Sequence, residues 1–408
     1  MYRYRWPRIT GDTEAAVLQQ LQGGEISIYD HSGIFKAFED RYAASLDRTH
    51  ALVVSSGTAA LHTAMMAAAF APGDEVICPA YTFYATVTPI FQTGALPILC
   101  DAGTDGNIDP VRISRLITPR TKAVIVTHMW GMPCDLDPIL VLCRQQGLLL
   151  IEDCSHAHGA QYKGRPVGSQ GDIAVFSLQG QKIITGGEGG ILLTNHTELY
   201  ERALLFGQYN KRCKQEIRQD SPYYAYAVTG FGLKLRAHPL AIAIANEQFT
   251  HLSQWHAAKQ KNAQYLTQKL DKYPELALPL PGHTGDEPAW YAYTFRLRPG
   301  HLDITTQEFC DELNAAGIAD VDVPGSTCPL NLLKLFQDPG LLFPAYADKL
   351  AYRPGDFPQA EAFFAAAIKL PIDVDTSSAY REVLDNYATI VGRILRRHRV
   401  QLPRKTDA

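Results

Sequence analysis

Short apolar segments alternate with helical segments between about residues 50 and 195, and this alternation limits the possible folds more than any other feature. The apolar segments are 51–54, 75–78, 96–100, 123–127, 148–151, 173–176 and 191–194. Short, nearly continuous apolar strands joined by helices are typical of a parallel sheet that is covered on both faces. The sequence therefore predicts an α/β domain with a mostly parallel central sheet, in which ligands bind beyond the carboxyl ends of the strands.

The pattern changes beyond about residue 236. A long helical run extends to about residue 270, an alternating strand covers 290–297, and helices are expected over 306–316 and 378–398. Such a mixture of helices with a separate strand indicates a second, smaller α+β domain, which also agrees with the length of 408 residues. We expect a large domain over 1–245, which includes an N-terminal segment, and a small C-terminal domain over 246–408.

Composition limits the partners and the compartment. The formal net charge is -4, so the chain has no strong positive field for nucleic acid. The 8 cysteines include no C-x-x-C pair, which favours buried thiols in a reducing compartment over disulfides or a zinc site. No apolar run reaches the roughly 18 residues of a membrane span. We therefore expect a cytoplasmic protein that acts on small molecules and binds neither nucleic acid nor a membrane.

Lys182 and Asp153 are the residues that indicate which kind of reaction the protein could catalyse. Lys182 stands between the strand 173–176 and the glycine-rich run 186–190, and Asp153 ends the strand that begins at 148. A lysine amine can form a Schiff base, and a strand-end carboxylate can keep a pyridine nitrogen protonated, so the pair predicts a pyridoxal phosphate (PLP) enzyme. Little side-chain bulk surrounds Lys182, and a partly desolvated lysine becomes a nucleophile. Judged alone, Lys182 would be a surface residue and Asp153 a turn or cap residue.

A phosphate site is predicted at the start of the helix that follows the strand 51–54. Ser56, Gly57 and Thr58 join a strand to this helix, whose N-terminal N–H groups suit a phosphate. Ser177 precedes the lysine by a few residues and could reach the same phosphate. Phe83 could stack on a flat ring. Each has a simpler interpretation, because Ser-Gly-Thr is also an ordinary helix cap, Ser177 could bond to backbone, and Phe83 could belong to the core.

His156 and His158 follow Asp153 closely, in a spacing that metal ligands also use. No further cluster of ligands accompanies them, so we expect no metal site. The alternative is that one of these histidines forms a hydrogen bond near the ring oxygen of the cofactor.

These segments together resemble the DegT/DnrJ/StrS family of sugar-type aminotransferases, which are PLP-dependent enzymes of fold type I. The resemblance runs from Trp6 to about Arg396. Its sharpest parts are 55–61, 72–77, 107–110, 152–160, 163–168, 171–177 and 187–190. It implies a large domain with a mostly parallel central sheet flanked by helices, plus a smaller α+β C-terminal domain.

The resemblance also implies a role for individual residues. Lys182 matches the Schiff-base lysine and Asp153 the partner of the pyridine nitrogen. His156 matches a position beside the cofactor ring, and Phe83 matches the aromatic residue that stacks on it. Both Lys182 and Asp153 are therefore expected to be catalytic as well as cofactor-binding.

The phosphate cradle and the quaternary structure follow from the same resemblance. Gly57, Thr58 and Ser177 match the cradle, and Ser56 adjoins it. The family is similar to other fold type I enzymes in forming homodimers that share their active sites. A loop of the partner subunit usually offers an asparagine to the phosphate, and the equivalent segment 232–236 has Lys234 at that position, which could bind phosphate as a point charge.

The implied reaction is a ping-pong transfer of an amino group from L-glutamate or L-glutamine. The acceptor in this family is usually a nucleotide-linked keto-sugar and sometimes a keto-cyclitol of antibiotic biosynthesis. Alternatives on the same fold are a lyase, a sugar dehydratase, a desulfurase and a PLP-binding sensor. The dehydratase branch has histidine at the lysine position. The segments 178–181 and 323–330 differ from the family pattern where substrate contacts are expected, so the sequence leaves the acceptor open.

Overall fold

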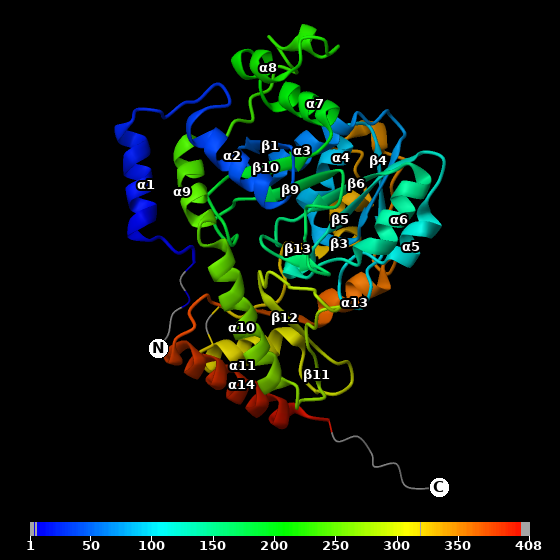
Figure 1. Ribbon diagram of the computed structural model, residues 1–408. Coiled ribbons are helices and arrows are strands. Elements are labelled where there is room, and N and C mark those ends of the chain that lie inside the picture. The colour runs from blue at the N-terminus through cyan, green and yellow to red at the C-terminus, as the bar shows by residue number, and fades with distance from the viewer. Residues whose placement is uncertain (1–3, 5, 319, 401–408) are drawn as a thin grey trace.

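A computed structural model describes residue 4, residues 6–318 and residues 320–400. A sheet of 7 strands forms the centre of the large domain, with helices around it (Figure 1). The strand order is β1-β10-β9-β6-β5-β2-β4. The strands are β1 (His50–Val54), β2 (Glu75–Pro79), β4 (Leu96–Cys100), β5 (Thr121–Thr127), β6 (Leu149–Asp153), β9 (Ile173–Ser177) and β10 (Gly190–Thr194). Only β10 runs antiparallel to its neighbours, β1 and β9. The predicted α/β class with a mostly parallel sheet is confirmed.

Helices cover both faces of this sheet, which explains why its strands are apolar throughout. Successive residues of a strand point to opposite faces, so Leu52 belongs to one core cluster and Val53 to the other. The first cluster includes side chains of α3 (Gly57–Ala68), α4 (Thr88–Phe91), α7 (Thr197–Gly207), α8 (Lys211–Glu216), α12 (Lys334–Gln337) and α13 (Pro358–Ala366). The second includes side chains of α2 (Gly33–Ser45), α5 (Pro110–Leu116), α6 (Leu136–Gln146) and α9 (Pro239–Phe249), and α1 (Gly11–Gln22) contacts α9.

A second, antiparallel sheet forms the C-terminal part of the molecule. It has the order β11-β12-β14, with β11 (Leu276–Ala277), β12 (Tyr293–Leu297) and β14 (Ala367–Leu370). The helices α10 (Leu252–Leu270), α11 (Thr306–Ala315) and α14 (Ser378–His398) share a core cluster with it (Figure 1). The strand and the two helices predicted in this region are therefore present.

The predicted domain boundary falls inside a helix. Residue 245 lies within α9, and the long helical run expected from 236 to 270 is divided at Thr250 and His251 into α9 and α10. Farther along the chain, β13 (Thr327–Pro329) returns to pair with β3 (Tyr81–Phe83) beside the large sheet. The division into 1–245 and 246–408 stays a prediction.

The cysteines agree with the expectation of buried free thiols. All 8 cysteines are buried and free of disulfide bonds. In the described part of the chain, no helix combines the length and apolar character that a bilayer crossing needs.

Candidate active site

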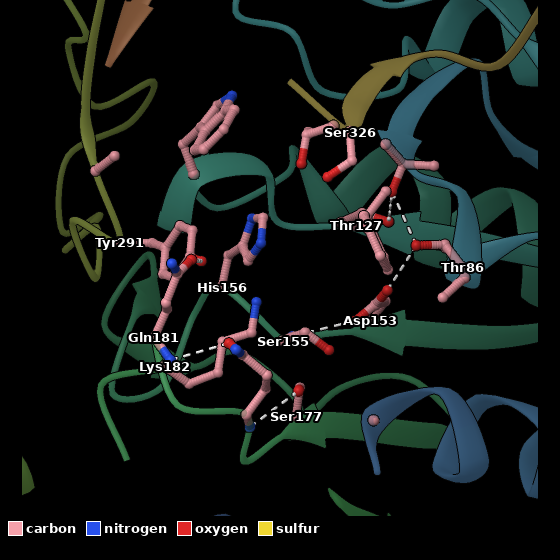
Figure 2. A pocket seen from close by; sticks show the side chains of 18 of the residues that line it. Thr86, Thr127, Asp153, Ser155, His156, Ser177, Gln181, Lys182, Tyr291 and Ser326 are labelled. Carbon is pink, nitrogen blue, oxygen red and sulfur yellow. Dashed lines mark hydrogen bonds between the residues drawn. The ribbon is translucent and has the colours of Figure 1, made fainter. Parts of the chain in front are cut away.

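A cavity of about 780 Å³ lies at the carboxyl edge of the large sheet and extends to the C-terminal sheet. Asp153 and Ser177 end neighbouring strands at this edge, and Lys182 and His156 face the same space (Figure 2). The predicted residues that line it are Ser56, Gly57, Thr58, Phe83, Asp153, His156, Ser177 and Lys182. The structure thus brings together every predicted site residue except Lys234.

Lys182 lies in the loop between β9 and β10. Its N–H donates to the carbonyl of Gln179 (2.8 Å), and its own carbonyl accepts the indole N–H of Trp6 (2.9 Å). Glycine allows this loop to return close to the start of α3, because a Cβ on Gly190 would lie only 2.3 Å from the carbonyl oxygen of Ser56. The glycine-rich run therefore holds the lysine loop against the cavity.

The charge state of Lys182 is shifted by its surroundings. Burial lowers the pKa of Lys182 to about 8, and the negative charge of Asp153 opposes that shift. Its Nζ lies 4.5 Å from the centroid of the Tyr291 ring. With this pKa, roughly one tenth of the amine is neutral at pH 7, against less than about one in a thousand for an ordinary lysine. Lys182 can therefore act as a nucleophile or a base near neutral pH.

This pKa predicts how Lys182 reacts in cofactor-free protein. Only the neutral amine is nucleophilic, so its rate of modification by an amine-reactive reagent should rise with pH to a midpoint near 8. Asp153→Asn removes the charge that raises the pKa, so the midpoint should fall further. Mass spectrometry of the modified peptide across a pH series measures both values.

Lys259 is an internal control for this experiment. Burial also lowers its pKa to about 8, but the residue is only 2% exposed and its Nζ donates to the carbonyl of Trp290 (3.0 Å). It should therefore react much more slowly than Lys182 in the same sample. A midpoint for Lys182 at the value of an exposed lysine would contradict the prediction.

Asp153 is buried at the end of β6, with its carboxylate held by two donors. The hydroxyl of Thr86 donates to one oxygen (2.7 Å), and the N–H of Ser155 donates to the other (3.1 Å). Thr86 also lies in hydrogen-bond contact with the hydroxyl of Thr82 (2.8 Å). These contacts fix the orientation of a carboxylate that can accept a hydrogen bond from a protonated ring nitrogen.

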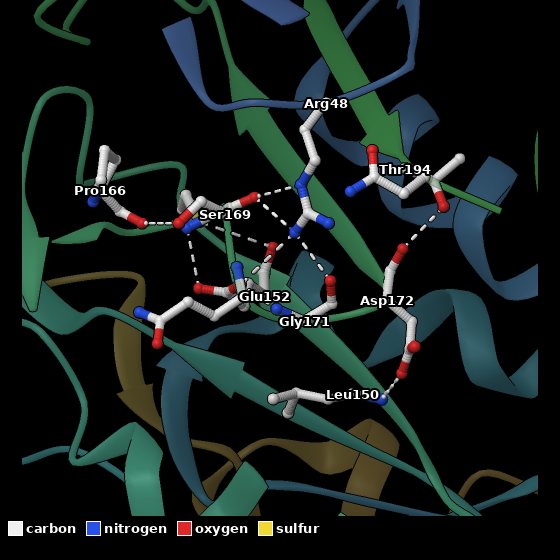
Figure 3. Close-up of polar contacts among 12 residues, drawn as sticks. Arg48, Leu150, Glu152, Pro166, Ser169, Gly171, Asp172 and Thr194 are labelled. Carbon is white, nitrogen blue, oxygen red and sulfur yellow. Dashed lines mark hydrogen bonds and ion pairs between the residues drawn. The ribbon is translucent and has the colours of Figure 1, made fainter.

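A buried network anchors the strand that carries Asp153 (Figure 3). Glu152 accepts the backbone N–H groups of Gly168 (2.8 Å) and Gly171 (2.5 Å), while Arg48 donates to the carbonyls of the same two glycines. Burial alone would raise the pKa of Glu152, but its hydrogen bonds lower it overall. The ionised carboxylate thus ties the loop before β9 to β6.

Glu152 also belongs to the group His128, Glu152 and Cys154, whose ligand atoms lie close enough to hold a metal ion. Its carboxylate already lies in hydrogen-bond contact with His128 (3.2 Å). Burial raises the pKa of the Cys154 thiol well above its usual value, which keeps the sulfur protonated. This chemistry fits a structural cluster, and the expected absence of a metal site stays a prediction.

The predicted phosphate cradle is built by the first turn of α3 and the end of β9. Ser56 caps the helix, since its hydroxyl accepts the N–H of Ala59 (3.0 Å). Gly57 lies directly against Ser177, where an added Cβ would be 2.6 Å from the serine Cβ. The N–H groups of the first helical turn and the positive end of the helix dipole suit an anion here, and Thr58 lines the cavity beside them.

Gly57→Ala is expected to lower the free energy of unfolding by about 1–3 kcal/mol and to weaken cofactor binding, because its methyl group would overlap Ser177. Denaturant unfolding and titration with PLP measure the two effects. Gly11→Ala is the control, since an added Cβ there meets no atom within 4 Å and should change stability by less than about 0.5 kcal/mol. Equal results for the two variants would refute the close-packing argument.

The two histidines after Asp153 have different surroundings. His156 stacks on Tyr291 with 4.1 Å between ring centroids, and its buried Nδ1 has no hydrogen-bond partner among the described residues. Burial lowers the pKa of His156 well below its usual value, so a neutral ring with an unpaired nitrogen borders the cavity. His158 instead contacts the hydroxyl of Tyr42 (2.9 Å) and the carbonyl of Ser177 (2.8 Å) in the core.

Some lining residues were not identified from the sequence. Thr86, Trp130 and Tyr291 come from loops and short turns, and no periodic pattern marks them. The run 178–181, which differs from the family pattern, was a better signal of cavity residues, because Gln179 and Gln181 both line the cavity. Lys234 is exposed and does not line the cavity of its own chain, so its contribution from a partner subunit stays a prediction.

The sequence profile of the DegT/DnrJ/EryC1/StrS aminotransferase family matches residues 7–386. The chain belongs to this family. Members of the family depend on PLP, and this protein is accordingly a PLP-dependent aminotransferase of fold type I. The cavity fits that cofactor, because it combines a half-buried lysine, an oriented carboxylate, an anion cradle and an unpaired ring nitrogen.

Two relatives and one crystal structure show how similar this member of the DegT/DnrJ/EryC1/StrS family is to known proteins. It is 36% identical to GDP-perosamine synthase of Caulobacter vibrioides over 76% of this chain and 81% of the relative. It is 30% identical to dTDP-3-amino-3,4,6-trideoxy-alpha-D-glucose transaminase of Streptomyces venezuelae over 90% and 88% of the two chains. The crystal structure of an aminotransferase from Psychrobacter cryohalolentis superposes with a TM-score of 0.86 at 26% identity, covering 97% of this chain and 99% of the other.

Proposed function

We propose that this aminotransferase moves an amino group from L-glutamate or L-glutamine to a keto-sugar, with a nucleotide-linked sugar as the first candidate acceptor. The observation that carries the proposal is that Lys182 and Asp153 face one cavity whose lining includes further polar side chains. The similarity to proteins named as a GDP-perosamine synthase and a dTDP-amino-sugar transaminase supports this acceptor class. A keto-cyclitol is the alternative, because its ring presents similar hydroxyl groups.

The residues divide the chemistry between them. When bound, PLP supplies a ring that withdraws electrons from the carbon next to the transferred amine. Lys182 moves the proton at that carbon, since its lowered pKa allows both protonation states near neutral pH. Asp153 keeps the ring nitrogen protonated through a hydrogen bond. Donor and acceptor use the same cavity in turn, so ping-pong kinetics are expected.

The cavity also offers groups that suit a polyhydroxylated acceptor. Its polar residues outside the predicted cofactor set include Gln179, Gln181, Glu188, Asp320, Ser326 and Lys369. Amides and carboxylates can together accept from and donate to sugar hydroxyls, and Lys369 could in addition face a phosphate. This lining supports a sugar or cyclitol, and an assay must decide between the two.

We further propose that a second copy of the chain completes each site. Lys234 is exposed on a segment near which large apolar side chains also reach the surface. These side chains are Tyr29, Tyr209, Tyr226, Val228, Phe231 and Leu233. An apolar surface of this kind indicates a protein contact, and a homodimer would carry Lys234 to the phosphate of the partner's cofactor. Sedimentation of the purified protein tests the dimer.

The donor half-reaction tests the proposed function. Protein loaded with PLP should lose its visible absorbance when L-glutamate or L-glutamine is added, and the 2-oxo acid should appear in equal amount. A panel of keto-sugars and keto-cyclitols should then restore the absorbance only with the true acceptor. D-glutamate is the control. If neither L-donor changes a protein that retains PLP, the transaminase proposal is wrong and a sensor or lyase is favoured.

Two observations bear on the rival reactions, one from the structure and one from the sequence. A desulfurase needs a mobile catalytic cysteine, whereas every cysteine of this chain is buried. The dehydratase branch of the family has histidine where this chain has Lys182. Both observations favour amino transfer.

A further inference from the structure

A second cavity, of about 190 Å³, lies behind the wall of the catalytic cavity. Trp130 and Ala292 border both cavities. The exposed residues Asp105 and Leu280 border the second cavity as well, so it has access to solvent.

Two polar side chains of β12 line this second cavity and lack a polar partner there. Thr294 and Arg296 alternate with Tyr293 and Phe295, which point into the core beneath the C-terminal sheet. Thr294 is 6% exposed, and its hydroxyl has no hydrogen-bond partner within the described ranges. The guanidinium of Arg296 contacts the ring of Phe363 (4.9 Å) but makes no hydrogen bond or ion pair with another described residue.

Water can reach the half-buried guanidinium through the open cavity, whereas the buried hydroxyl of Thr294 has no partner among the described residues. A ligand that brings two acceptor oxygens could pair with both groups. Burial lowers the pKa of Arg296, but an arginine remains charged in a protein. A guanidinium and a neighbouring hydroxyl match the planar oxygens of a carboxylate. The end of the ligand that lies at Arg296 should therefore carry a negative charge.

Apart from Thr104 and Asp105, the remaining wall is apolar, which defines the other end of the ligand. It includes Met129, Trp130, Met132, Leu278 and Pro279. We propose that the second cavity binds a small carboxylic acid, with its carboxylate at Arg296 and Thr294 and a flat apolar body against Trp130 and the methionines. This site is separate from the one that holds the cofactor.

Asp105 is the charged group that could oppose this proposal, because it also borders the cavity. Its oxygens already accept hydrogen bonds from the backbone N–H (3.2 Å) and the side-chain amide (3.0 Å) of Asn107. It raises the pKa of Arg296 by charge attraction but forms no ion pair with it. Because Asp105 is exposed, solvent screens it, and a bound carboxylate can make the direct contacts that Asp105 does not.

The shared wall provides a signal for binding. The indole N–H of Trp130 donates to the hydroxyl of Tyr81 (3.1 Å), and its ring stacks with His156 of the catalytic cavity at 5.6 Å. A ligand that packs on Trp130 should change its fluorescence, and Trp130→Phe should remove that change.

Benzoate is the probe for this site. The PLP-loaded protein should bind benzoate in a calorimetric titration, and neutral benzamide should bind at least tenfold more weakly. Arg296→Gln should weaken benzoate binding by roughly 10- to 100-fold, because it removes a charged hydrogen-bond donor. Thr294→Val should weaken it by about tenfold and should leave the unfolding midpoint of the ligand-free protein unchanged or higher, since no existing hydrogen bond is lost.

Two controls separate this site from its neighbours. Arg298→Gln changes an exposed arginine beyond the end of β12 and should leave benzoate affinity unchanged. Lys182→Ala should also bind benzoate normally, whereas it removes amino transfer. The proposal is overturned if the wild-type protein does not bind benzoate, if Arg296→Gln binds it equally well, or if Lys182→Ala abolishes binding and so places the ligand in the catalytic cavity.

Discussion

Lys182→Ala is expected to lower kcat/KM for amino transfer by about 10⁴-fold or more, because it removes the amine that moves the proton at the reacting carbon. The donor half-reaction should disappear as well, so L-glutamate and L-glutamine should no longer bleach the visible absorbance of bound PLP on the time scale of turnover. Stopped-flow absorbance and steady-state kinetics measure the two effects. Turnover within tenfold of the wild type would exclude Lys182 from the reaction.

Lys259→Met is the matched control for that substitution. Burial gives Lys259 a pKa of about 8, the same as that of Lys182, but its amine donates to the carbonyl of Trp290 outside the catalytic cavity. Its replacement should alter the unfolding midpoint while kcat stays within about tenfold of the wild type. A lowered pKa alone does not identify the catalytic lysine, because Lys182 and Lys259 share it. The position of Lys182 in the catalytic cavity distinguishes the two residues.

Asp153→Asn should lower kcat by about 10³-fold, a loss typical for an oriented electrostatic partner of the reacting system. Asparagine preserves the shape of the side chain and can still accept from Thr86, so the fold should be retained. Without the carboxylate, however, the ring nitrogen loses the charge that keeps it protonated. Steady-state kinetics give the loss of kcat, and calorimetric unfolding verifies the fold.

Asp172→Asn controls for the removal of a carboxylate beside the sheet. Asp172 accepts the N–H of Leu150 (2.8 Å) and contacts His196 (2.9 Å), and it does not line the catalytic cavity. Its replacement should reduce stability but change kcat only a few-fold. If both variants lost kcat equally, the effect of Asp153 would have to be structural.

The strand-end residues of the site could be predicted because their position depends on few interactions. Asp153 and Ser177 end apolar strands, and parallel neighbours bring their carboxyl ends to one edge. Gly57 begins the helix that follows a third strand of the same sheet. Local pattern and sheet topology were sufficient for these three residues.

Other parts of the site depend on contacts between distant segments. Trp130 and Tyr291 stack around His156 although one precedes it and the other lies in the C-terminal half of the chain. Trp6 reaches the carbonyl of Lys182 across 176 positions of sequence. Such contacts follow from the packing of loops, for which the sequence has no periodic signal.

The sequence by itself determined the family, the sheet and the residue types of the reaction, because strand patterns, the motifs of the family and the residues that follow the strands are local features. Only the tertiary structure decided the pKa values and the hydrogen bonding of the side chains. Lys182 has a pKa of about 8 because folding buries it near Asp153. The unpaired hydroxyl of Thr294 is likewise a property of the packed fold, since burial and missing partners exist only when distant segments enclose a side chain.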